Sequence, residues 1–391
     1  MAMTAKSISL AILELALAVG LSACISHGHG LIYTVDHSPS SPDPIGEPWD
    51  RAEGADVYIV GNGDRLFKNG VSTRLGALPN ATSWWGRSVF VDGNDVYVAG
   101  NAREICNNQL STYAVMWKND VPRRLGRSSG KHDYSMALSI FVAGGHVYVS
   151  GFDDYPNPNN DGRTDRMPVL WVDGEPHVLL TGNIYGGEAN SVFVTPGGDV
   201  YVGGFVDWSA HIWINGVRQP NLFVADGYAT QTRIDSVFVD GDDVYAVGSD
   251  YVSPWNRAVL FKNGRGRVLA DYGWANSVFV SGGVVYVGGD EVNMEPNGVG
   301  TGNRGYAVLW KDGEKHRLTE GVYSEASVTS VFVSNGDVYM SGYEQVTKPS
   351  LAPPGTPENR SYLWINGEAI DMESSYGIKT AGSVFVERKD K

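Results

Sequence analysis

Acidic residues recur at one point of an internal repeat, and carboxylates are groups that can hydrolyse glycosides or bind cations. Each acid lies shortly after a repeated strand-like element, and the set is Asp64, Asp153, Asp154, Asp207, Asp250, Asp290, Glu291 and Glu344. Two carboxylates on opposite sides of a glycosidic bond can hydrolyse it. Acids at such positions also cap the N–H groups of turns. The pattern therefore leaves two interpretations open, a negatively charged funnel mouth or a set of turn caps.

Aromatic residues recur at a second point of the repeat. Every repeat carries at least one ring there, and the set is Trp84, Trp85, Tyr134, Tyr185, Tyr228, Tyr272, Trp274, Tyr323 and Tyr376. A crown of rings could stack on sugars or other flat ligands. The alternative is that each ring fills a gap between neighbouring units, which the repetition favours. Trp84–Trp85 and Tyr272/Trp274 are doubled and break the repeat, so they are the better ligand-binding candidates.

One loop could bind a metal ion. Its oxygen-bearing residues alternate, and they are Asn157, Asn159, Asp161 and Asp165. Such oxygen ligands suit calcium, and Gly162 permits a sharp turn. The stretch resembles the calcium hairpin loops of integrin-type propellers, although Asn157 stands where an acid is expected. A structural Ca²⁺ is one hypothesis and a polar turn is the other. The sequence indicates no further cofactor.

Other catalytic motifs are missing from the sequence, so no catalytic residue is assigned. The eight histidines show no zinc-type spacing, and no serine-nucleophile elbow occurs. Gly298-x-Gly300-x-Gly302 is not followed by a helical pattern, which excludes a dinucleotide site.

The elements that position these residues are repeated along the chain. A Ser-(Val/Ile)-Phe-Val element begins at Ser88, Ser139, Ser191, Ser236, Ser277, Ser330 and Ser383. Each of the first six copies is followed by a Val-Tyr strand ending in glycine, and then by a strand with Trp or Phe and a tight turn, usually Asn-Gly or Asp-Gly. The copies recur about every 49 residues, and propeller blades have periods of about 40 to 50 residues.

The two ends of the repeat array are out of phase. The first unit lacks an opening strand before Val57, and the last consists only of the opening strand 383–386. Together they make one complete unit. The sequence therefore predicts an all-β, seven-bladed β-propeller with four antiparallel strands per blade, closed by strand 383–386 joining the N-terminal blade.

This pattern resembles bacterial extracytoplasmic seven-bladed β-propeller repeat lipoproteins. It is also similar to repeats of the HAF type, through the stretch from Ala307 to Gly313, which reads Ala-Val-Leu-Trp-Lys-Asp-Gly and runs on to Leu318. The resemblance covers residues 56–386, and its motifs are structural. It implies a propeller scaffold and assigns no catalytic residue.

The connections between blade strands alternate between two faces of a propeller. Connections between the first and second strands and between the third and fourth are short. The others are long and unequal, as at 290–308 and 343–362. Variable loops on a rigid scaffold are where binding residues usually lie. We therefore expect the site on the loop-rich face.

The N-terminus resembles a lipoprotein signal. An apolar run at residues 8–20 is followed by Leu21-Ser22-Ala23-Cys24, and it is too short to span a bilayer. Glu14 departs from the pattern, because a carboxylate is costly in lipid. An ordinary secretory signal and a buried structural helix are the alternatives. We expect a signal peptide at 1–23, lipidation of Cys24, a flexible tether over 24–55 and the propeller over 56–391. The protein would then be extracytoplasmic and membrane-anchored, in the periplasm or at the cell surface.

The charge balance restricts the partners. The net charge is −14, which argues against nucleic acid and leaves the lipid anchor as the membrane contact. We expect a monomer that binds a glycan or an envelope protein through the loop-rich face. A glycoside hydrolase or lyase using loop carboxylates is the first alternative, and a structural envelope scaffold is the second.

Overall fold

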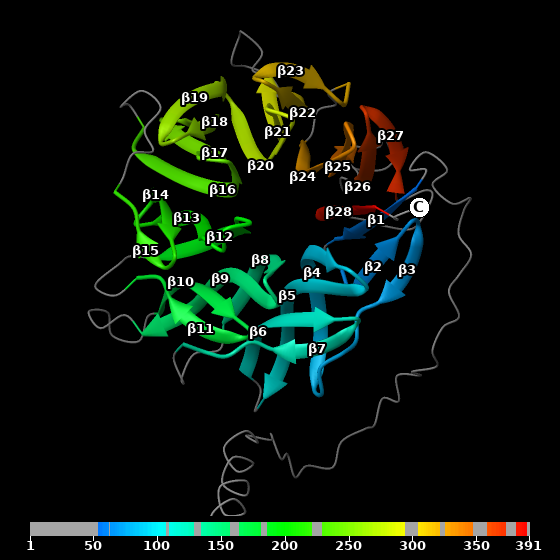
Figure 1. The fold of residues 1–391 in the computed structure, drawn as a ribbon, viewed down its shortest axis with the longest axis vertical. Coiled ribbons are helices and arrows are strands. Elements are labelled where there is room, and N and C mark those ends of the chain that lie inside the picture. The colour runs from blue at the N-terminus through cyan, green and yellow to red at the C-terminus, as the bar shows by residue number, and fades with distance from the viewer. Residues whose placement is uncertain are drawn as a thin grey trace, which may run out of the picture.

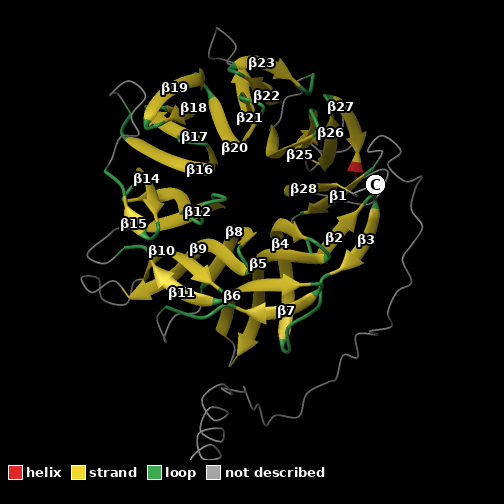
Figure 2. Cartoon of the chain, in the orientation of Figure 1, coloured by secondary structure: helices red, strands yellow, loops and turns green. Residues whose placement is uncertain are grey.

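Seven four-stranded antiparallel sheets are arranged in a ring (Figures 1 and 2). The computed structural model describes residues 54–61, 63–106, 109–128, 134–156, 164–180, 186–220, 229–293, 304–320, 325–346, 358–372 and 381–388. The predicted seven-bladed β-propeller is confirmed.

The strands occupy four positions in each blade, counted outward from the axis. The innermost strands are β28 (Ser383–Arg388), β4 (Ala81–Asp92), β8 (Ser135–Ala143), β12 (Gly187–Val194), β16 (Gln231–Asp240), β20 (Gly273–Ser281) and β24 (Ala326–Ser334). The second strands are β1 (Ala55–Val60), β5 (Asp95–Cys106), β9 (His146–Pro156), β13 (Val200–Val206), β17 (Asp243–Val252), β21 (Val284–Asn293) and β25 (Asp337–Val346). The third strands are β2 (Arg65–Lys68), β6 (Gln109–Lys118), β10 (Thr164–Val172), β14 (Ser209–Ile214), β18 (Trp255–Lys262), β22 (Arg304–Lys311) and β26 (Glu358–Ile365). The outermost strands are β3 (Val71–Arg74), β7 (Val121–Arg124), β11 (Glu175–Val178), β15 (Val217–Arg218), β19 (Arg265–Ala270), β23 (Glu314–Arg317) and β27 (Glu368–Asp371).

The ring closes through the two ends of the chain, as predicted. Strand β28 pairs antiparallel with β1, so that Val57 lies opposite Val386 and Ile59 opposite Val384. All four side chains are buried in one hydrophobic cluster. Closure in this way removes the two free sheet edges that an open array would expose.

The serine of each Ser-(Val/Ile)-Phe-Val element joins adjacent blades. Its hydroxyl accepts a hydrogen bond from the backbone N–H of the residue after the serine in a neighbouring blade. The seven bonds are 3.0 to 3.4 Å long and form a complete ring, which includes Val89 to Ser383 and Val384 to Ser330. The serine is therefore a structural residue of the scaffold.

The phenylalanine of the same element packs around the axis. Seven rings contact one another in a closed circle, with centroid separations from 4.7 to 5.2 Å. Tilted contacts at this spacing are favourable for aromatic pairs. The phenylalanine circle surrounds the axis, and each ring stands two residues after the serine of its strand.

The Asn-Gly and Asp-Gly turns join the third and fourth strands. Asn69 and Gly70 both have positive φ, 49° and 80°, as a tight hairpin turn requires. The Asn69 Oδ1 atom also accepts the Val57 N–H at 2.8 Å, and the equivalent bond occurs in the other blades, for example from Val96 to Asn119. These residues stabilise the blades.

The described part of the chain holds no helix that is long and apolar enough to cross a bilayer. Cys24, the proposed signal peptide and the tether up to residue 53 lie outside the described residues.

Candidate functional site

A cavity of about 1020 Å³ lies among the inner strands of six blades. Its wall includes residues of β4, β8, β12, β16, β20 and β24, which surround the axis in Figure 1. Its rim includes Trp255 at the start of β18, Tyr272 between β19 and β20, and Glu325 just before β24. These positions lie on or beside connections from a second to a third strand and from a fourth to a first strand, so the cavity opens on the face that the sequence indicated.

A β-bulge in each of these six inner strands supplies the cavity wall. The ladder to the second strand skips one residue immediately before the repeated serine, and the skipped residues are Arg87, Leu138, Asn190, Asp235, Asn276 and Thr329. All six line the cavity. A bulged residue is unpaired and its side chain is redirected. Through its bulge, each of the six blades therefore contributes one side chain to the wall of the cavity.

The glycine that ends each Val-Tyr strand makes room for the bulge. A Cβ atom on Gly100 would lie 1.9 Å from the carbonyl oxygen of Trp85, and one on Gly289 would lie 2.0 Å from that of Trp274. Other residues cannot be accommodated at such distances without a backbone shift. The repeated glycine and serine are thus structural residues. The variable residue immediately before the serine is the one whose side chain lines the cavity.

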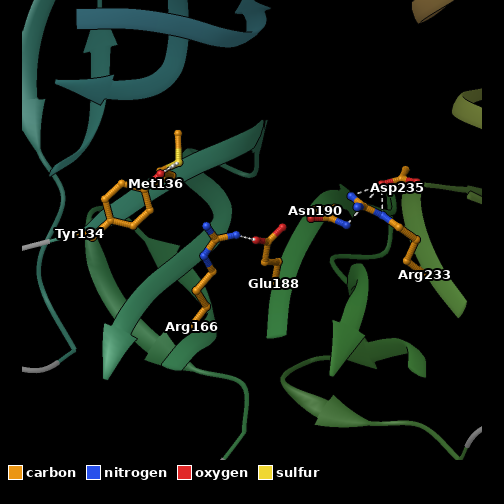
Figure 3. Close-up of polar contacts among 7 residues, drawn as sticks. All are labelled: Tyr134, Met136, Arg166, Glu188, Asn190, Arg233 and Asp235. Carbon is orange, nitrogen blue, oxygen red and sulfur yellow. Dashed lines mark hydrogen bonds and ion pairs between the residues drawn. The ribbon is translucent and has the colours of Figure 1, made fainter. Parts of the chain in front are cut away.

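Three arginines line the cavity, and Figure 3 shows two of them, Arg166 and Arg233, with their carboxylate partners. Arg166, on β10, forms an ion pair with Glu188 of the next blade and lies 4.6 Å from the Phe152 ring centroid. Arg233 binds Asp235 with an Nη2–Oδ1 distance of 2.6 Å. Burial raises the pKa of Asp235 and Arg233 opposes that shift. These two arginines are neutralised by their own carboxylates.

Arg87 is the third arginine of this wall, and its surroundings differ. Its Nε atom donates to Oδ1 of Asn101 at 3.1 Å, and Asn101 is only 2% exposed. Burial lowers the Arg87 pKa, while Tyr134 and Glu188 act in the opposite direction. Among the described residues, no carboxylate forms an ion pair with Arg87.

A hydrogen-bonded carboxylate lies elsewhere in the cavity wall. Asp290 Oδ1 accepts a hydrogen bond from Ser327 Oγ at 2.9 Å, and Asn276 Nδ2 donates to the same Ser327 oxygen at 2.8 Å. Burial raises the Asp290 pKa to about 7, although the bonds from Ser327 and the Trp274 N–H lower it, and nearby Glu325 raises it further. A carboxyl that titrates near neutrality can act as a general acid.

Aromatic rings form a further part of the wall. Trp255 and Tyr272 meet edge to face, with centroids 5.9 Å apart and an interplanar angle of 86°. Trp255 is 43% exposed and Trp274 is 39% exposed. Large exposed indoles beside polar groups are suited to stacking on a ligand. Of the predicted aromatic residues, Tyr272 and Trp274 line the cavity.

The other described members of the predicted aromatic crown pack against the scaffold. Trp84 donates its Nε1–H to the Leu75 carbonyl at 2.9 Å, and Arg103 stacks on Trp85 at 4.7 Å. The Tyr134 hydroxyl donates to Met136 Sδ at 3.3 Å. The Trp84 bond joins two blades, whereas the Trp85 and Tyr134 contacts lie within one blade. Ligand binding by the three rings stays a prediction. Tyr185, Tyr228, Tyr323 and Tyr376 lie outside the described residues.

Of the predicted loop acids, Asp290 lines the cavity. Several others are bonded to nearby groups: Asp64 to Arg74, Asp153 to Ser128, Asp154 to Thr164, Asp250 to Arg257, and Glu291 to Lys315 and Arg317. Asp207 and Glu344 lie near the ends of β13 and β25. The structure thus brings together one predicted acid and several groups that the sequence analysis did not single out, such as Asp235, Glu188 and Glu325.

The candidate calcium loop falls almost wholly outside the described residues. Asn157, Asn159 and Asp161 belong to that undescribed part, and Asp165 lies on β10 opposite Tyr155. Within the described ranges, no group of three or more His, Cys, Asp or Glu side chains could hold a metal ion. Calcium binding stays a prediction.

The arginines and amides of the cavity were not identified from the sequence, although a signal for them exists. Aligning the seven copies on the repeated serine shows that the preceding residue changes from blade to blade, being Arg87, Leu138, Asn190, Asp235, Asn276, Thr329 and Gly382. Because the serine is constant and the residue before it varies, the side chain at that preceding position is not required for the fold and is available to bind a ligand.

No protein-family model matches the sequence, and no curated protein is similar to it. Similar solved structures include the Trypanosoma rangeli sialidase in complex with the inhibitor DANA, with 10% identity and a TM-score of 0.40 over 68% of this chain and 53% of that chain. The β-propeller domain of the Trilobed protease from Pyrococcus furiosus has 11% identity and a TM-score of 0.41 over 74% of this chain and 84% of that domain. The Pseudomonas aeruginosa periplasmic gluconolactonase has 12% identity and a TM-score of 0.41 over 86% of this chain and 99% of that chain.

The chain spans about half the length of the sialidase that it matches. Identities and scores this low carry no argument about ligand or activity, so the function is inferred from the cavity itself.

Proposed function

We propose that this protein is a binding module that takes a sugar-like, polyhydroxylated ligand into its axial cavity. The observation that carries the proposal is the arrangement of the cavity wall. Bulged Asn190, Asp235, Asn276 and Thr329 place polar side chains on the same space as Trp255, Tyr272 and Trp274.

Sugars need both kinds of contact. Their hydroxyl groups exchange hydrogen bonds with amide and carboxylate side chains, and their apolar ring faces pack on aromatic rings. A cavity of about 1020 Å³ is at the upper end of the volumes that hold small ligands, about 300 to 1,000 Å³. It has room for more than one sugar ring.

A glycan binding screen with the full-length protein tests this proposal. Trp274→Ala should weaken binding about tenfold or more, because a sugar ring loses the stacking area that the indole provides. Trp208→Ala is the matched control, since Trp208 is also exposed, at 59%, but does not line the cavity. Equal loss in both variants, or binding unaffected by Trp274→Ala, would contradict the proposal.

Glycoside hydrolysis in the same cavity is the second candidate function. It is favoured by Asp290, whose carboxyl lines the cavity and has a pKa raised to about 7, mainly by burial. Asp290 would serve as the general acid and Glu325 as the second carboxylate. Release of reducing ends from bound oligosaccharides, abolished by Asp290→Asn with binding retained, would establish it. Oligosaccharide binding without hydrolysis would contradict the hydrolase function and support the binding module.

The cellular setting is also a proposal. The apolar run at residues 8–20, followed by Leu21-Ser22-Ala23-Cys24, supports a lipid-anchored, extracytoplasmic protein. We propose that it is a monomer exposed to envelope glycans or proteins. Metabolic labelling with a fatty acid should mark the wild type and leave Cys24→Ala unmarked. Labelling that persists in Cys24→Ala would overturn the anchor.

A further inference from the structure

The arginine side of the cavity holds more positive than negative charge. Arg87, Arg166 and Arg233 line it together with the carboxylates of Glu188 and Asp235. Each carboxylate is engaged by one arginine, Glu188 by Arg166 and Asp235 by Arg233. On this side of the cavity the Arg87 guanidinium has no carboxylate partner among the described residues, while the other two acidic residues of the lining, Asp290 and Glu325, lie on β21 and just before β24. A guanidinium without a carboxylate partner on the wall of a cavity can bind an anionic group of a ligand.

The orientation of Arg87 leaves a defined surface for that ligand. Its Nε–H is used by the buried amide oxygen of Asn101 at 3.1 Å, which holds the planar group in place. The two Nη atoms remain, and their parallel N–H groups match the two oxygens of a carboxylate or sulfate. Glu188 is near enough to influence the Arg87 pKa, but its Oε1 atom is bound to Arg166.

The geometry points to an acidic sugar as the ligand, with its carboxylate or sulfate group seated on Arg87. This inference rests on the proposed function and narrows it to glycans that contain uronic acids or sulfate esters. One guanidinium without a carboxylate partner can pair with one negative group of the ligand. Glu188, Asp235, Asp290 and Glu325 also line the cavity, so a doubly charged phosphate would meet more repulsion than a singly charged group.

The remaining wall sets the ligand's orientation. Asp290 and Glu325 are the acidic residues of that part, and Asn276 and Ser327 are hydrogen-bonded to each other beside Asp290. A second acidic group on that side would be repelled. The neutral hydroxyl groups of the ligand therefore face Asn276 and Asp290, and its acidic group faces Arg87.

Matched pairs of oligosaccharides test the inference. Polygalacturonate, alginate and hyaluronan oligomers are titrated into the full-length protein by calorimetry, each beside its carboxyl-reduced neutral form, and sulfated oligomers beside their unsulfated parents. At least one acidic oligomer should bind about tenfold more tightly than its neutral partner, as expected for a charge-assisted bidentate contact. Arg87→Gln should remove this preference, and Arg87→Lys should keep part of it.

Arg65→Gln is the control, because Arg65 is an exposed arginine on β2 that bonds Ser72. If Arg87→Gln does not fold, the salt dependence of binding to the wild-type protein tests the inference instead. Only the acidic oligosaccharide, and not its neutral partner, should lose affinity in high salt. Equal binding of acidic and neutral partners, or a preference that survives Arg87→Gln in the folded variant, overturns the inference while leaving sugar binding intact. A panel in which neither form binds overturns the proposed function together with the inference.

Discussion

The backbone N–H of Val89 donates to the hydroxyl oxygen of Ser383, 3.4 Å away and 294 positions further along the chain. Equivalent bonds join all the remaining pairs of adjacent blades, for example from the Ile140 N–H to the Ser88 hydroxyl oxygen. The C-terminal strand therefore contributes both a sheet edge and an inter-blade contact to the closed ring.

Removing residues 383–391 should abolish cooperative folding at ambient temperature. The deletion leaves β1 without its antiparallel partner and removes Val384 and Val386 from a buried cluster, and an unpaired, apolar strand edge promotes aggregation. Thermal unfolding followed by circular dichroism provides the measurement. The milder Ser383→Ala should cost only about 1 kcal/mol. A deletion variant that melts like the wild type would refute closure by β28.

Raising the pH from 5 to 8 should lower stability through Asp290. Its folded pKa of about 7, raised chiefly by burial, exceeds the ordinary value of 3.8. The folded state thus holds this proton more tightly, and the resulting stability is lost as pH rises through 7. The loss should be on the order of 1–3 kcal/mol and should shrink in Asp290→Asn.

Glu291→Gln is the control for this pH dependence. The neighbouring Glu291 is partly buried, but bonds from Lys315 and Arg317 hold its pKa below the usual value. Its contribution is lost at acidic pH, outside the range from 5 to 8. Denaturant melts at the two pH values provide the measurement, and an unchanged pH dependence in Asp290→Asn would contradict the assignment.

Gly289→Ala should destabilise the protein by about 2 kcal/mol or more. The added Cβ would lie 2.0 Å from the Trp274 carbonyl oxygen, so the bulge that carries Asn276 must shift. Urea melts measure the loss, and ligand titration should show weaker binding. Gly63→Ala is the control, because a Cβ at that position meets nothing within 4 Å. Equal stabilities of the two variants would argue against a glycine-dependent bulge.

Calcium should raise the melting temperature if the loop around Asp161 binds it. A ligand that binds only the folded state stabilises it in proportion to the logarithm of its concentration. Thermal melts in calcium and in chelator measure the effect, and Asp161→Ala should make the two curves coincide. Identical wild-type curves in both conditions would remove the metal hypothesis.

The fold was predictable because its signals are repeated. The seven serines, the Val-Tyr strands and the Asn-Gly turns each recur with one period, and the incomplete first and last units predicted the β28–β1 pairing. Each of these residues makes a hydrogen bond or a turn that recurs in every blade, as Asn69 does when it accepts the Val57 N–H. The spacing of these residues in the sequence was therefore enough to predict the blades.

The cavity was predicted only in part. The loop-rich face, Tyr272, Trp274 and Asp290 were identified from the sequence, whereas Arg87 and Asn276 were not. A bulge changes where a side chain points without changing the hydrophobic pattern of the strand, because Val278 and Val280 remain buried after the skipped Asn276. The regular alternation of strand residues therefore conceals the position that faces the axis.

A structure of the protein with a bound oligosaccharide tests the central claim most directly. We predict ligand density in the axial cavity, with an acidic group at the Arg87 Nη atoms and a sugar ring against Trp274. Density on the outer strands or on the face of the short turns, with an empty cavity, would contradict the account.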